Sequence, residues 1–153
     1  MKHPVRLLPL AAIALVASGC SVVNPITTHK DYNASDGITV EVGDVKGINL
    51  LVVTEAKDSP AVLVGTLHNY GTEDVQVSAS IDGSGITTID VPAGASVTLG
   101  GQDAEEHVEG TSTAAPGLVQ PVTLQTDATG QVSADVPVLD GTLEEYASEL
   151  DGL

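Results

Sequence analysis

The sequence predicts an all-β protein, a sandwich of about 7–9 short strands followed by a short C-terminal helix. Short runs rich in β-branched residues recur along the chain, and Gly, Pro, Asn and Asp stand between them, where they favour chain reversal. Residues 75–81 alternate apolar and polar side chains, as in a strand with one buried and one solvated face. No succession of strands and long helices is present, and this makes parallel-sheet enzymes poor candidates.

The predicted strands follow one another between residues 38 and 139. Their ranges are 38–42, 48–54, 61–69, 74–81, 85–91, 96–99, 106–109, 119–125 and 131–139. The turn signals between them are Asn69-Tyr70-Gly71, Asp82-Gly83-Ser84-Gly85, Pro92-Ala93-Gly94, Gly100-Gly101 and Ala128-Thr129-Gly130. Glycine permits a positive φ in these turns, and proline presets the first corner. Each signal therefore favours a reversal of the chain.

The end of the chain has a helical pattern. Thr142 and Glu145 have the spacing of a capping box, in which each side chain bonds to the backbone of the other. Leu143, Tyr146 and Leu150 follow the helical period and form an apolar stripe. We therefore predict a short amphipathic helix over 141–153. It closes one end of the sandwich, or it serves as a partner-binding tail.

The first residues have the pattern of an export signal. Lys2 and Arg6 precede an apolar run over 7–17, and small residues lead to Cys20, the only Cys in the chain. The run is too short to span a bilayer, which takes about 20 residues. Residues 17–20, Ala-Ser-Gly-Cys, resemble the lipobox of bacterial lipoproteins. The resemblance implies cleavage before Cys20 and lipid on its thiol. The alternative is an ordinary secretory signal followed by a free thiol.

These patterns predict four segments. Residues 1–19 are a lipoprotein signal peptide, and 20–35 are a polar tether that carries the lipidated Cys20. Residues 36–140 are the β-sandwich domain, and 141–153 are the short helix or tail. The predicted location is the outer, extracytoplasmic face of the cell membrane, where the chain is held by its lipid.

The charge of the chain is strongly acidic. All 21 acidic residues lie beyond residue 19, whereas only Lys30, Lys46 and Lys57 remain once the signal is removed, which leaves a formal charge of −18. Such a surface repels phosphate, so no nucleic-acid partner is expected and membrane contact is expected through the lipid alone. The acidity can serve solubility near an envelope, or it can capture cations or basic partners.

No catalytic, cofactor-binding or metal-ligating residue is assigned. Three histidines, His29, His68 and His107, lie beyond the signal, but none belongs to a spaced metal motif. Acidic groups at 103–106 and 140–142 do not have the ligand spacing of a calcium loop. Gly83-Ser84-Gly85 lacks the context of a nucleophile elbow, and there is no phosphate-binding loop. The chain is therefore predicted not to be an enzyme and to need no cofactor.

Several segments resemble the PCuAC-type periplasmic copper chaperones, together with small actinobacterial-type lipoproteins that carry a related domain. The similar segments are 47–53, 64–71, 91–94 and 136–139, besides the lipobox. The resemblance implies an immunoglobulin-like or cupredoxin-like β-sandwich outside the cytoplasm. It does not carry over the Met- and His-rich copper site, because the only Met is Met1 and it leaves with the signal.

Two functions remain open at this point. The first is a non-enzymatic binding or accessory module of the cell envelope, with an envelope protein as the possible partner. The second is metal handling, as a divergent copper protein of the PCuAC-like group. A stoichiometric metal bound at His68 would favour the second, whereas the lack of Met in the exported part favours the first.

Overall fold

A computed structural model describes residues 35–101, 104–150 and 153, with the side chain of Glu145 left out. The chain divides into two compact units, and the second, Asn33–Leu153, contains the domain. The signal peptide, Cys20, most of the tether, His29 and Asp103 lie outside the described residues. Among the described residues, no helix has the length and apolarity needed to cross a bilayer.

All of the predicted strands are found, and the fold class predicted from the sequence is confirmed. The elements are β1 (Ile38–Val42), β2 (Val45–Thr54), β3 (Ser59–Asn69), β4 (Val75–Ile81), β5 (Ser84–Val91), β6 (Ser96–Leu99), β7 (Val108–Ser112), β8 (Val119–Thr126), β9 (Gly130–Leu139) and α2 (Glu144–Ala147).

The strand boundaries differ most from those predicted at β2 and β7. β2 begins at Val45, because a tight turn after β1 pairs Val42 with Val45. β7 begins at Val108, where its ladder with β3 starts at Leu63. The preceding Glu105 and Glu106 instead donate their backbone N–H groups to the carbonyl of Thr98. The local hydrogen-bond partners, which the sequence pattern does not reveal, set both boundaries.

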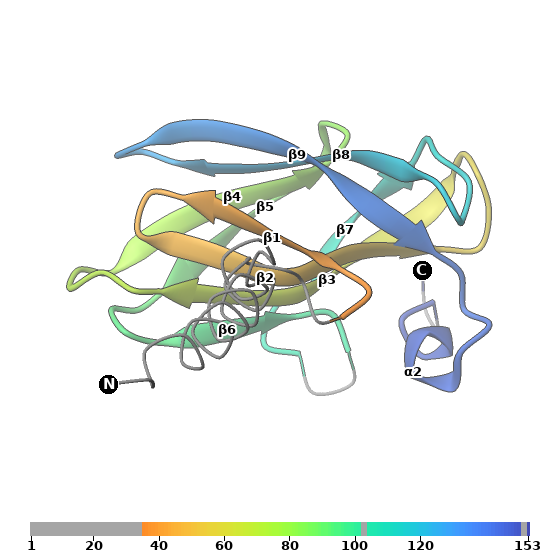
Figure 1. Ribbon diagram of the computed structural model, residues 1–153, viewed down its shortest axis with the longest axis horizontal. Coiled ribbons are helices and arrows are strands. Elements are labelled where there is room, and N and C mark those ends of the chain that lie inside the picture. Colours follow the sequence, from red (N-terminus) through yellow and green to blue (C-terminus); the bar gives the residue numbers. More distant parts are fainter. Residues whose placement is uncertain (1–34, 102–103, 151–152) are drawn as a thin grey trace, which may run out of the picture. The chain divides into compact units, whose positions relative to one another are not determined.

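The strands form two layers that join along one seam (Figure 1). One layer contains β1, β2 and β3, and β3 carries β6 along one part of its edge and β7 along the other. The other layer has the order β5-β4-β8-β9. At the seam β9 runs parallel to β2, with Val52 opposite Val138, while the remaining strand pairs are antiparallel. The result is a partly closed β-sandwich.

The main core lies between the layers and is aliphatic. Its largest buried side chains include Leu50, Leu63, Leu67, Ile81 and Ile89. In β4 Val77, Ala79 and Ile81 are buried and Gln76 is exposed, as the alternation predicts, but Ser80 is buried as well. Without Phe or Trp in the chain, the core depends on interdigitated branched side chains.

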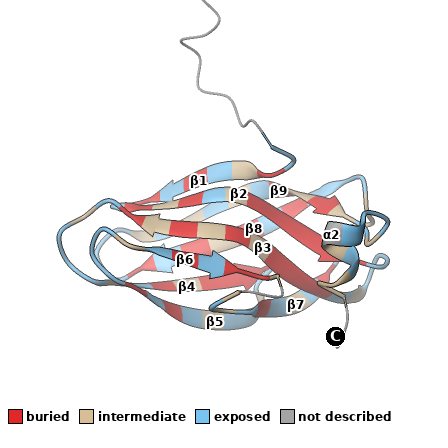
Figure 2. Ribbon diagram, turned by 90° about the horizontal axis from the view of Figure 1, so that it is seen from below, coloured by how far each residue is buried: buried red, intermediate tan, exposed pale blue. Residues whose placement is uncertain are grey.

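A second, smaller apolar cluster lies on the outer face of the first layer. Leu51, Val53 and Val62 are buried there, and Leu139, Tyr146 and Leu150 are among the residues that pack against them. β2 is therefore buried on both faces from Leu50 to Thr54, and Figure 2 shows this buried stretch beside α2. The C-terminal segment thus covers one outer face of the sheet near the end of the sandwich.

Thr142 does not occupy the N-cap position that the predicted capping box requires. α2 begins after Leu143, which makes no capping side-chain hydrogen bond. The backbone N–H of Thr142 instead donates to Asp140 Oδ1 at 3.0 Å. This Asx turn takes up the backbone N–H of Thr142, which lies directly before the N-cap residue Leu143. The helix has only four residues, and Tyr146 packs against the apolar outer face of the sheet.

Candidate functional site

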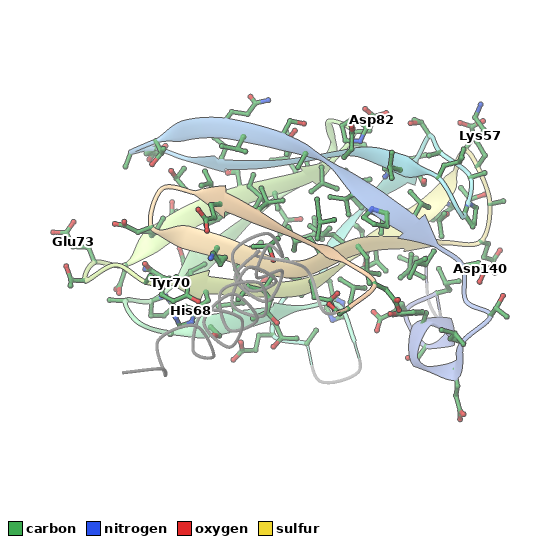
Figure 3. The ribbon with its side chains drawn as sticks, in the orientation of Figure 1. Lys57, His68, Tyr70, Glu73, Asp82 and Asp140 are labelled. Atoms are coloured by element: carbon green, nitrogen blue, oxygen red, sulfur yellow. The ribbon has the colours of Figure 1, made fainter. Side chains whose placement is uncertain are left out.

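His68 belongs to a small polar and aromatic cluster on the outer face of β2, β3 and β6. Its Nδ1 lies 2.8 Å from the hydroxyl of Ser96. Its ring packs edge to face against Tyr70, with centroids 4.2 Å apart, and Figure 3 shows the two rings side by side. Lys46 Nζ lies 5.8 Å from the Tyr70 ring and 2.7 Å from Glu41 Oε1. The imidazole is therefore positioned by its neighbours, and it is half-buried.

The structure does not bring His107 to His68. His68 pairs with Ser96 at the start of β6, whereas Glu106, next to His107, bridges Leu99 at its end. Ser96 and Leu99 are three residues apart along β6, a distance of about 10 Å in an extended strand. His107 is exposed. Over residues 35–101, 104–150 and 153, no three His, Cys, Asp or Glu side chains are grouped so that they could hold a metal ion.

Ser84 has a structural role. Its hydroxyl donates to the carbonyl of Ile81 at 2.6 Å and accepts from the N–H of Thr111 at 3.0 Å. These bonds tie the start of β5 to β7 and occupy the oxygen that a nucleophile would need. No hydrogen bond between Ser84 and a basic side chain is found in the described part of the chain.

A surface hollow opens between α2, the end of β9 and the loop before β8. Its volume is about 390 Å³, and Leu139, Leu143 and Tyr146 are among the residues that line it. Asp36 and Asp140 also line it. The Tyr146 hydroxyl donates to Asp36 Oδ2 at 3.1 Å, which connects the start of the domain to the C-terminal helix. The hollow therefore combines apolar walls with two carboxylates.

Asp140 is expected to stay ionised beside this hollow. Hydrogen bonds from the hydroxyl and then the backbone N–H of Thr142 hold its pKa below the ordinary value. The carboxylate is exposed to solvent, as its position at the surface near α2 shows (Figure 3). It presents a fixed negative charge at the rim.

A second hollow, at the other end of the sandwich, is acidic. It has a volume of about 420 Å³ and is lined by residues that include Asp44, Glu73, Asp74 and Asp127. Asp74 Oδ1 accepts a hydrogen bond from the N–H of Ala93 at 2.9 Å. This carboxylate therefore joins the loop before β4 to the turn after β5. Neither hollow has a local signal in the sequence, because each is lined by residues from loops that are distant along the chain. Only the helical period of Leu143 and Tyr146 pointed toward the first.

The described domain, with its two layers and its aliphatic core, is a cupredoxin-like β-sandwich. No protein-family profile matches the chain, and no curated protein matches it in sequence.

Solved PCuAC domains have a similar fold. The apo PCuAC domain from PmoF1 matches with a TM-score of 0.52 at 20% identity, over 66% of this chain and 98% of that one. The copper-bound PCuAC domain from PmoF2 gives 0.51 at 20% identity, over 67% and 98%. The apo PmoF2 domain gives 0.53 at 18% identity, over 69% and 98%. The chain therefore has a PCuAC-like fold, and the resemblance noted in its sequence is confirmed at the level of the fold.

Proposed function

We propose that this chain is a non-enzymatic binding module of the cell envelope, held at the outer face of the membrane by lipid on Cys20. The observation that carries the proposal is a PCuAC-like fold whose residues 21–153 contain neither Met nor Cys. The scaffold is retained without the sulfur atoms that suit Cu(I). Its remaining distinctive feature is surface chemistry: high acidity and a hollow with apolar walls.

The residues present do not fit a cuprous ion. Thioether and thiolate donors select Cu(I), and the single Cys is assigned to the lipid. The two described imidazoles lie near opposite ends of β6, and His68 has Tyr70 and Ser96 as its neighbours. The described residues therefore do not supply the donors that a Cu(I) site needs.

A metal titration tests the proposal. We expect the chain from Ser21 to Leu153, stripped with chelator, to show no saturable binding of Cu(I), Cu(II) or Zn(II) tighter than about 1 μM in calorimetry. One tight equivalent that disappears in His68→Ala and persists in His107→Ala would contradict the proposal. His107→Ala is the matched control because that side chain is exposed and lies outside the His68 cluster.

The same titration decides on a second candidate function, which is the handling of Cu(II) or Zn(II). The similarity to a PCuAC domain that was solved with copper favours this candidate. His68 would be the first ligand, with Nδ1 held by Ser96 and Nε2 facing the metal. Further donors would have to come from residues outside those described, or from a second molecule.

The anchor has a test of its own. We expect Cys20→Ser to abolish incorporation of radiolabelled palmitate and to move the protein from the membrane fraction into an unprocessed or released form, because serine has no thiol to acylate. Ser21→Ala, one residue further along, should remain labelled and membrane-bound. A Cys20→Ser protein that is still matured and still retained in membranes would overturn the lipid anchor.

A further inference from the structure

Large apolar side chains are exposed at the hollow beside α2 and in the segment that follows its lining residue Gly117. Leu143, which lines the hollow, is 50% exposed, and Leu118 and Val119 are 59% and 55% exposed. Leu118 directly follows Gly117, another lining residue, and its carbonyl accepts the N–H of Val138 at 2.8 Å. Isolated exposed leucines are ordinary on protein surfaces, whereas exposed apolar side chains at and near a concave site are typical of a contact surface.

The hollow is built from parts that hold one another in place. Tyr146 and Leu150 pack on the apolar outer face of the sheet, and the Tyr146 hydroxyl bonds to Asp36. Glu149 Oε2 accepts the N–H of Gly101 at 2.5 Å, which fastens the chain beyond α2 to the loop after β6. A volume of about 390 Å³ lies at the small end of the range of ligand pockets, roughly 300–1,000 Å³. A pre-formed site of this size suits one or two apolar side chains.

The negative charge around the hollow favours apolar ligands that also carry a positive charge. Asp36 and Asp140 line it, and none of the described lysines does. Asp140 accepts hydrogen bonds from Thr142, which keep its charge in place. An acidic peptide or an anionic lipid headgroup would be repelled, both here and by the strongly acidic chain as a whole. A cationic group next to an apolar one would complement both features of the site.

We infer that this end of the sandwich docks a peptide segment of a partner protein, with an apolar side chain in the hollow and a flanking Lys or Arg beside Asp36 and Asp140. The inference rests on the proposed binding function and names its surface and its class of partner. The membrane surface is the competing occupant. It is disfavoured because two carboxylates stand among the apolar residues that would have to enter the bilayer.

The test is a titration followed by backbone amide chemical shifts in the chain from Ser21 to Leu153. The probe is the hexapeptide Gly-Arg-Leu-Leu-Arg-Gly, with matched peptides that carry Glu for Arg or Gly for Leu. We expect saturable shifts confined to residues 36, 116–119 and 139–146, and only with the peptide that carries both Arg and Leu. Leu143→Ser should weaken binding about tenfold, because the apolar contact that would bury Leu143 in the complex is lost. Asp140→Asn, which keeps the turn acceptor, should weaken it about threefold.

Ile86→Ser is the matched control, since Ile86 is 73% exposed on β5 and does not line the hollow. Equal shifts with the Glu peptide, shifts scattered over the acidic surface, or no saturation below about 1 mM would each overturn the inference. If the amides of residues 36, 116–119 and 139–146 shift with phosphatidylcholine vesicles but not with the peptide, the inference is overturned as well. Because the metal titration reports on His68, the proposed function and this docking surface can fail separately.

Discussion

Gly85→Ala is expected to lower the free energy of unfolding by about 4 kcal/mol, through backbone strain and a steric clash. Gly85 has a φ of +60°, and a Cβ built on it would lie 1.5 Å from the carbonyl oxygen of Glu109 in β7. The start of β5 thus comes into backbone contact with β7, where the Ser84 hydroxyl also accepts from Thr111. One of the two backbones has to move, and the bonds between them are lost.

Urea unfolding followed by far-UV circular dichroism measures this loss. The matched control is Gly83→Ala, two residues earlier in the same turn. Gly83 also has a positive φ, +74°, but an added Cβ would meet no atom within 4 Å. Only the cost of a left-handed alanine applies there, about 1 kcal/mol. Equal losses in the two variants would show that β5 and β7 are not in contact.

Asn69→Ala is expected to lower the free energy of unfolding by about 3 kcal/mol, because three backbone groups lose their partner. The Asn69 side chain is fully buried. Its Nδ2 donates to the carbonyls of Glu73 at 2.8 Å and Val91 at 3.0 Å, and its Oδ1 accepts the N–H of Gly71 at 2.8 Å. One amide thus fastens the turn after β3 to the end of β5.

Asp74→Ala is the control in the same loop. Asp74 accepts one exposed hydrogen bond from Ala93, and its removal should cost less than about 1 kcal/mol. Asn69→Asp separates the donor from the acceptor role, because a carboxylate still accepts from Gly71 but cannot donate to the two carbonyls. Burial disfavours the ionised form of the new carboxyl group and so raises its pKa in the folded protein. The variant should therefore lose stability as the pH rises above the pKa that this carboxyl group has in the unfolded chain. An Asn69→Ala protein as stable as Asp74→Ala would contradict the assigned role.

Some features of the fold could be predicted from local pattern. The alternation in β4 orients its side chains, because successive residues of a strand face opposite sides. Asp82 and Gly83 both have positive φ and connect β4 to β5 directly, as expected of a two-residue hairpin with this sequence. His68 is an odd number of residues from Leu63 and Leu67, so strand alternation is enough to place it on the face away from the core, where the structure has it.

Other features had no local signal. Leu51, Val52 and Val53 form a continuous apolar run, and such a run does not reveal what covers its outer face. The cover is Tyr146 and Leu150, which lie almost a hundred residues further along the chain. The docking hollow likewise joins Asp36 to residues 116–117 and 139–146. Residues so distant in sequence meet only through the packing of the sheets.

By itself, the sequence determined the strands, most of their turns and the aliphatic character of the core, because residue conformation and hydrophobic period are local properties. It also determined that residues 21–153 offer no sulfur ligand, because composition alone decides that. The tertiary structure decided that the two described histidines stay apart, that Asn69 joins two strands, and that the C-terminal helix builds a hollow. These depend on long-range pairings such as β9 with β2, which follow from the burial of the whole apolar surface and not from any one segment.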